Sequence, residues 1–192
     1  MTLVSVPMRR RTVLTALGAT TLGGCLSQAE QLANQKTKTM TQQTPPECDS
    51  DLALLTTDLD QKYTIKKGTT EKFSLEIEPA SVNLGQDISI HLKNISSESQ
   101  RTGSRDHYAI QKKDNGEWDH IFSTKGNVLL DAQAVDHDPS DGFTWEFTVS
   151  PIGFSIGPYY VCKELKSGKY RFVYFGLPND AALESAFEIS SD

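Results

Sequence analysis

Sequence patterns that accompany catalysis or membrane spanning are scarce in this chain. Its 192 residues include four histidines and three cysteines, and they contain neither a His-Glu-x-x-His zinc motif nor a glycine-rich loop that would cradle a phosphate. No apolar run after residue 24 approaches the eighteen residues that a transmembrane helix requires, and no repeat of fixed period is visible. These absences disfavour metalloenzymes, nucleotide-binding proteins and membrane-spanning proteins. We expect no enzyme activity, no cofactor and no metal.

Positive charge is also in short supply. The chain has 19 Lys and Arg residues against 25 Asp and Glu residues, which gives a formal charge of −6. Removal of residues 1–24 would take away three arginines and no acidic residue, so the charge would become −9. A surface this acidic is a poor match for nucleic acid or anionic lipid, and neither is expected as a partner.

The N-terminus has the layout of a secretory signal. Arg9-Arg10-Arg11 precedes about ten mostly apolar residues, 13–22, and Leu22-Gly23-Gly24-Cys25 follows. The apolar core is too short to span about 30 Å of hydrocarbon. Arg10-Arg11-Thr12-Val13-Leu14 resembles the twin-arginine export motif, and Leu22-Gly23-Gly24-Cys25 resembles a lipobox.

Together the two resemblances imply export followed by lipid attachment. Cleavage before Cys25 would free its thiol for a two-chain lipid, which holds a protein to a membrane more firmly than one chain does. We expect a cleaved signal at 1–24, a flexible linker at 25–50 and a folded domain at 51–192. The linker has few large apolar side chains and cannot bury enough surface to fold. Membrane lipid at Cys25 would hold the domain on the outer face of the cytoplasmic membrane.

The other two cysteines are Cys48 and Cys162. An even pair in an exported protein predicts a disulfide, because the compartment is oxidising. Two buried thiols or a metal site are the alternatives, and the lack of a neighbouring histidine disfavours the metal.

From residue 51 the pattern is that of β-strands. Apolar and polar residues alternate over 73–77 and 88–92, which indicates strands with one buried face. Asn115-Gly116 between two such runs predicts a tight hairpin. The remaining elements are expected as strands at 145–149, 170–175 and 186–189, a turn cluster at 79–86 and one short helical turn at 179–185.

Seven or eight short strands, with turns about every ten residues, predict an all-β antiparallel sandwich. Residues 165–172 have the Leu-x-x-Gly-x-Tyr-x-apolar spacing of a tyrosine corner, in which the hydroxyl of Tyr170 ties a loop to a strand. In the alternative interpretation Tyr170 is an ordinary half-buried aromatic residue of a strand.

Three segments, 73–95, 108–122 and 165–176, resemble the immunoglobulin-like domains of bacterial and archaeal envelope lipoproteins. The shared features are a strand pair ending in Lys-Asn, a Lys-Lys-x-x-Gly-x-Trp hairpin and a final Gly-Lys-Tyr-Arg. The resemblance covers about 70–190. It implies an immunoglobulin-like sandwich in the cell envelope and assigns no catalytic residues. Because Cys48 lies ahead of the sandwich, the inter-sheet disulfide of antibody domains is not expected.

Four places could carry chemistry or modification. The acidic segment 136–142 is rich in oxygen ligands but departs from calcium-loop spacing, so a solvated turn is expected. His107 and His120 each follow an aspartate, but no nucleophile is recognisable beside them, and surface or strand positions are expected. Asn94-Ile95-Ser96 is a glycan acceptor sequence at the end of a strand, which would expose Asn94.

The loop 153–160 is our first candidate for a binding surface. It carries Phe154, Ile156 and Tyr159 among glycines, and loops at the end of a sandwich commonly provide recognition. The loop 101–106 is a second candidate. In the alternative interpretation the apolar side chains of 153–160 fold back over the core as a lid.

The sequence therefore predicts a lipid-anchored envelope protein whose domain binds an unidentified envelope protein or ligand, or is an accessory part of an envelope assembly. A proteinase-inhibitor-like sandwich is the alternative, since small inhibitor sandwiches have a similar strand layout. A metal-dependent envelope enzyme ranks third.

Overall fold

The fold is described by a computed structural model that covers residue 48 and residues 51–125 and 133–190. Every described residue belongs to one compact unit of the chain. Strands dominate these residues and most pairs are antiparallel, so the all-β class predicted from the sequence is confirmed. Among the described residues, no helix is long and apolar enough to cross a membrane.

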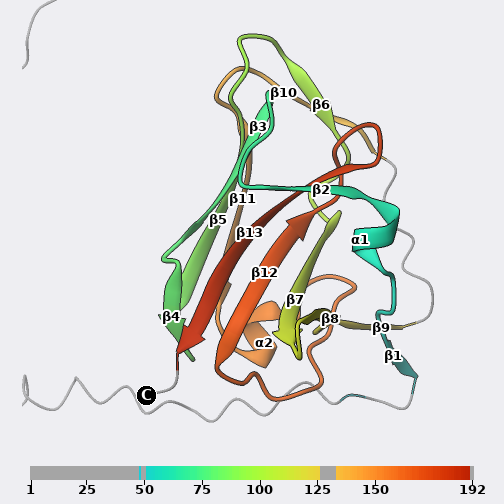
Figure 1. The fold of residues 1–192 in the computed structure, drawn as a ribbon, viewed down its shortest axis with the longest axis vertical. Coiled ribbons are helices and arrows are strands. Elements are labelled where there is room, and N and C mark those ends of the chain that lie inside the picture. The colour runs from blue at the N-terminus through green and yellow to red at the C-terminus, as the bar shows by residue number, and fades with distance from the viewer. Residues whose placement is uncertain (1–47, 49–50, 126–132, 191–192) are drawn as a thin grey trace, which may run out of the picture. The chain divides into compact units, whose positions relative to one another are not determined.

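The described residues form thirteen strands and two four-residue helices (Figure 1). In chain order they are β1 (Leu52–Leu54), α1 (Leu59–Lys62), β2 (Thr64–Lys67), β3 (Phe73–Glu78), β4 (Ser81–Asn83), β5 (Asp87–Asn94), β6 (Gln100–Thr102), β7 (Tyr108–Asp114), β8 (Glu117–His120), β9 (Ser123–Lys125), β10 (Val135–His137), β11 (Gly142–Thr148), α2 (Pro151–Phe154), β12 (Gly168–Tyr174) and β13 (Ala181–Ser190). The count exceeds the expected seven or eight because five strands have only three residues, too few to show an alternating pattern.

Two sheets form the body of the fold. The larger has the order β2-β13-β12-β7-β8, with β4 also paired to β13, and the smaller has the order β11-β5-β3. The last strand, β13, pairs in parallel with β2 and with β4, and all other pairs are antiparallel. Two short pairs, β1 with β9 and β10 with β6, lie outside these sheets.

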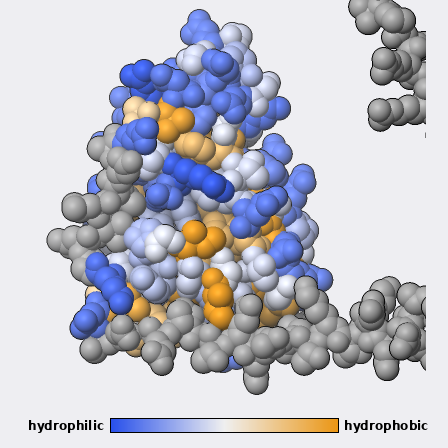
Figure 2. Space-filling model, turned by 180° about the vertical axis from the view of Figure 1, so that it is seen from behind, coloured by the Kyte–Doolittle hydropathy of each residue, from blue (hydrophilic) through white to orange (hydrophobic). Residues whose placement is uncertain are grey.

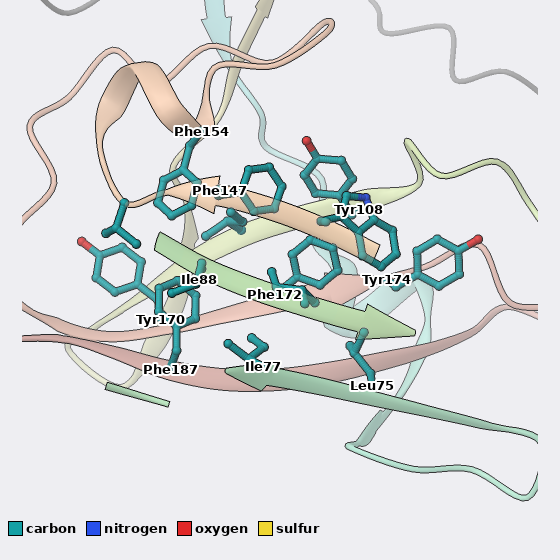
Figure 3. Packing of buried hydrophobic residues seen from close by; sticks show 14 of the residues in the cluster. Leu75, Ile77, Ile88, Tyr108, Phe147, Phe154, Tyr170, Phe172, Tyr174 and Phe187 are labelled. Carbon is teal, nitrogen blue, oxygen red and sulfur yellow. The ribbon is translucent and has the colours of Figure 1, made fainter. Parts of the chain in front are cut away.

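The main core lies between the two sheets. Leu75, Ile77 and Ile88 from the smaller sheet belong to the same buried cluster as Tyr108 and Phe172 from the larger one (Figure 3). The period-two alternation of the strands places these side chains on the inner faces. Seen from behind, the surface is mostly hydrophilic, with hydrophobic residues in separate small groups (Figure 2).

The outer face of the larger sheet is also partly covered. Helix α1 lays Leu59 against Ala109, Val173 and Ala182, which form a second, smaller buried cluster. Asp58 is the N-cap of the helix, and its side chain accepts a hydrogen bond from the Gln61 amide. One segment ahead of the sandwich thus shields a sheet face from water.

The local sequence signals had mixed outcomes. The Asn115-Gly116 hairpin is confirmed, and both residues have positive φ, at 48° and 95°. The turn cluster 79–86 contains the short strand β4, which pairs with β13. The helical turn expected at 179–185 is wrong, because β13 begins at residue 181 and its ladder with β12 outweighs the local pattern.

The tyrosine corner is present. The Tyr170 hydroxyl donates a 2.6 Å hydrogen bond to the carbonyl of Lys166, and the residue is 1% exposed. This bond satisfies a buried hydroxyl and fixes the loop that leads into β12.

A disulfide joins Cys48 to Cys162, with a Cα–Cα distance of 5.6 Å and a sequence separation of 114 residues. The pair expected from the sequence is therefore bonded in the structure. It ties the start of the described chain to the loop before β12 and closes a loop that holds most of both sheets.

We predict that Tyr170→Phe lowers the free energy of unfolding by about 1 kcal/mol, because the ring stays packed while the Lys166 carbonyl loses its donor. Urea denaturation followed by tryptophan fluorescence measures the change. Tyr63→Phe is the matched control, since the Tyr63 hydroxyl has no hydrogen-bond partner among the described residues. Equal effects of the two substitutions would contradict the corner's role.

Candidate functional site

The acidic segment 136–142 is divided between solvent and core. Asp136 accepts two hydrogen bonds from Arg101, at 2.7 and 3.0 Å, and both side chains are exposed. His137 is 1% exposed, and its Nε2 lies 2.9 Å from Thr102 Oγ1. Within the described part of the chain, no group of three or more His, Cys, Asp or Glu side chains is placed to hold a metal ion. The expected fully solvated turn is thus wrong for His137, which packs edge-on against Phe143.

The two histidines next to aspartates are engaged by other groups. His107 Nδ1 lies 3.0 Å from Ser104 Oγ. His120 Nε2 lies 2.7 Å from the carbonyl of Thr57, so Nε2 carries the proton and donates it. The Nδ1 of His120 is buried without a hydrogen-bond partner. Neither ring is hydrogen-bonded to its neighbouring aspartate.

Residues 153–157 read Gly-Phe-Ser-Ile-Gly, which is the spacing of the hydrolase nucleophile elbow and was missed in the sequence-based prediction. That elbow places its serine between a strand and a following helix, whereas Ser155 is the C-cap of α2. Ser155 Oγ donates to the carbonyl of Pro151 at 2.6 Å and accepts from the amide of Val161 at 2.9 Å. Both bonds hold the loop together, so the hydroxyl has a structural role here.

The loop 153–160 lies over the core. Phe154 is fully buried, and Tyr159 is 3% exposed and donates a 2.8 Å hydrogen bond to the carbonyl of Asp106. Only Ile156, at 49% exposure, presents a large apolar side chain to solvent. Phe154 and Tyr159 therefore fold back over the core, as the alternative interpretation predicted. Their side chains are not accessible to a binding partner in this fold.

Asn94 corrects the expectation of an exposed glycan acceptor. Its side chain is fully buried, and Nδ2 donates to the carbonyls of Glu98 and His137 at 2.8 and 2.9 Å. Oδ1 accepts from the amide and hydroxyl of Ser96. The side-chain amide thus holds the end of β5 to neighbouring segments by hydrogen bonds. A glycan on Nδ2 would have to displace these bonds.

The strongest polar cluster of the described fold is centred on Arg171 in β12. Its guanidinium is 2% exposed on the outer face of the larger sheet and donates to Gln111 at 2.8 Å, to Glu184 at 2.6 Å and to both carboxylate oxygens of Asp60. The indole of Trp118 covers it, with Cζ 4.6 Å from the ring centroid. This arrangement connects α1, β7, β8, β12 and β13 through one side chain.

The cluster forms one end of a shallow groove of about 340 Å³ on the same face. Lys67, Lys113 and Lys169 line the groove together with Trp118, and all three lysines are exposed. They come from β2, β7 and β12, so a rigid sheet fixes their backbone positions. We call this feature the Trp118 groove; its remaining lining residues are Gly68, Glu184, Ser185 and Ala186.

The sequence alone did not reveal this site. Alternation along β12 places Arg171 on the face opposite to Tyr170, which is a readable signal, and the hairpin places Lys113 across from Trp118. The partners Asp60 and Glu184 are 111 and 13 residues away from Arg171 and could not be paired with it from spacing. Arg10, Arg11 and Cys25, the expected export and lipidation residues, lie outside the described residues.

Comparison with known proteins leaves the family open. No protein-family model matches the chain, and neither does any curated protein. A β-glucosidase from Listeria innocua in complex with glucose is similar at 18% identity and a TM-score of 0.31, over 62% of this chain and 16% of that one. A β-glucosidase from Erythrobacter marinus is similar at 15% identity and a TM-score of 0.31, over 60% and 15% of the two chains. The chain spans less than a fifth of those enzymes, and likenesses this weak support no statement about activity.

We predict that Arg171→Met lowers the free energy of unfolding by about 3 kcal/mol, because it leaves the carboxylate of Glu184, whose side chain is only 12% exposed, without its partner. The figure lies at the low end of the usual range, since the side chain of Asp60 is 54% exposed and can be solvated. Chemical denaturation measures the loss. Arg101→Met breaks an exposed ion pair and should leave stability unchanged. Similar losses in both variants would refute the importance of burial.

Stability should also fall on mild acidification. Burial lowers the pKa of His137 and of His120 below the ordinary value near 6.5, because it penalises the charged imidazolium. The unfolded chain then binds more protons than the folded one below about pH 6.5, so stability is full above that pH and declines as the pH falls. Denaturation at several pH values between about 7.5 and 5, with NMR titration of the His137 ring, tests this. Constant stability over that range, with an NMR midpoint at 6.5 or above, would contradict it.

Proposed function

We propose that the chain is an exported, lipid-anchored protein whose immunoglobulin-like domain works by binding on the outer face of the cytoplasmic membrane. The observation that carries the proposal is the Cys48–Cys162 disulfide in a chain whose first 25 residues resemble an export and lipidation signal. Disulfides persist outside the cytoplasm and are rare within it. The cross-link and the N-terminal pattern are separate features of the chain, and both favour the same compartment.

The strand order supports the immunoglobulin-like assignment. A three-stranded sheet, β11-β5-β3, packs against a sheet containing β7, β12 and β13, and β4 joins β13 in parallel. The tyrosine corner at Tyr170 lies at the start of β12, where such folds use one. The disulfide differs from that of antibody domains, because Cys48 precedes the sandwich and Cys162 lies in a loop.

The distribution of polar groups supports binding. Ser155 and His107 are held by hydrogen bonds from neighbouring loop residues. In contrast, the lysines of the Trp118 groove point to solvent from a braced sheet. A sheet face with exposed charged groups is suited to holding a ligand whose own charges are complementary.

Cys25→Ser tests the anchoring. We predict that the wild-type protein sediments with membranes and resists extraction by high salt, because two acyl or isoprenoid chains hold it, whereas the variant is found outside the cytoplasm in the soluble fraction. Fractionation followed by immunoblotting measures the distribution.

A Cys48→Ser/Cys162→Ser variant is the control for loss of cysteine as such, and it should remain with the membrane. Two outcomes would reject the proposal: the Cys25→Ser variant staying on the membrane as firmly as the wild type, or the wild-type protein remaining inside the cell.

A further inference from the structure

We infer that the Trp118 groove binds the carboxylate groups of an acidic envelope polysaccharide. This deepens the proposed binding function and rests on it for the location outside the membrane. The groove is open along the outer face of the larger sheet and has a volume of about 340 Å³. That volume is at the lower end of the range for enclosed small-molecule sites, so the groove is suited to one stretch of an extended polymer.

The lining of the groove carries more positive than negative charge. Lys67, Lys113 and Lys169 are exposed, and none of them has an ion-pair partner within the described part of the chain. Glu184 is the one acidic residue in the lining, and its carboxylate already accepts a 2.6 Å hydrogen bond from Arg171. Glu184 is therefore not free to neutralise the lysines, although Glu188, outside the lining, lies opposite Lys169.

The residues directly opposite the three lysines differ. Lys169 lies opposite Glu188 and Lys67 lies opposite Glu184, whereas Lys113 lies opposite Trp118. The carboxylate of Glu184 is already bonded to Arg171. An anionic ligand would therefore give Lys67 and Lys113 an ionic partner that they lack within the described part of the chain.

Trp118 provides the aromatic surface of the groove. Its ring is held by the guanidinium of Arg171 at 4.6 Å from the centroid, and the Nζ of Lys113 lies 5.3 Å from the same centroid. The ring is half-buried, so part of it remains available to a ligand. An indole beside ammonium groups offers an apolar surface to the C–H groups of a sugar ring while the lysines meet its carboxylate.

The balance of charge favours a polymer with widely spaced anions. A nucleic acid or an anionic bilayer presents dense negative charge, which the acidic remainder of the domain would repel. Glu188 in β13 is exposed and lies directly opposite Lys169 in β12, so its carboxylate adds to that repulsion at the edge of the groove. A uronic acid polymer carries one carboxylate per sugar, so its charge is less dense than that of a nucleic acid or a bilayer, and separate carboxylates can meet Lys113 and Lys169.

The test uses the full chain purified in detergent and a fluorescent hexamer of galacturonic acid, with its neutral methyl ester as the comparison. At low salt we expect the acid to bind and the ester to bind at least about tenfold more weakly. Lys113→Gln/Lys169→Gln should weaken binding of the acid by about tenfold or more, since hydrogen bonds to charged groups are among the stronger polar contacts. Lys66→Gln/Lys93→Gln removes the same charge from exposed positions outside the groove and should change the affinity by less than about twofold.

Two results would overturn the inference: no binding of the acid by the wild-type chain, or equal weakening in the two double variants. Binding of a DNA oligonucleotide or of phosphatidylglycerol vesicles through Lys113 and Lys169, in place of the uronate, would overturn the assignment to a polysaccharide. Because binding is measured in detergent solution, its failure is separate from a failure of anchoring at Cys25.

Discussion

The buried guanidinium of Arg171 is the interaction on which the outer face of this domain depends. It neutralises Glu184, holds Asp60 at the start of α1 and lies under Trp118. Burying a charge is costly unless every donor finds an acceptor, and here the donors are shared among two carboxylates and one amide. The same side chain therefore attaches a helix to the sheet and binds the carboxylate of Glu184, the residue opposite Lys67.

The larger sheet is covered on both faces. The main core buries its inner face, and α1 covers part of its outer face. Phe172 is fully covered on the inside, and Val173 is fully covered on the outside by the smaller cluster. A sheet restrained on both faces is a stiffer support than a loop, which is why the rigid surface of this domain lies on strands. The loop 153–160, which resembles a recognition loop in composition, is used to close the end of the core instead.

Local sequence patterns predicted much of the fold. Period-two alternation located β3 and β5, and Asn115-Gly116 located a hairpin because both residues tolerate positive φ. The spacing around Tyr170 indicated a hydroxyl bonded to a loop, and that bond is present. Asn94 shows the limit of such signals, because an acceptor sequence says nothing about whether the amide is taken by carbonyls from 4 and 43 residues away.

The sequence by itself determined the all-β class and the main strands, because these rest on alternation and turn chemistry, and it predicted the pairing of Cys48 with Cys162 that the structure contains. Only the tertiary structure decided that Phe154 and Tyr159 are buried, that α1 covers the larger sheet and that Arg171 meets Asp60 and Glu184. Those outcomes depend on contacts between residues far apart along the chain, which the packing of two sheets brings together and no local pattern encodes.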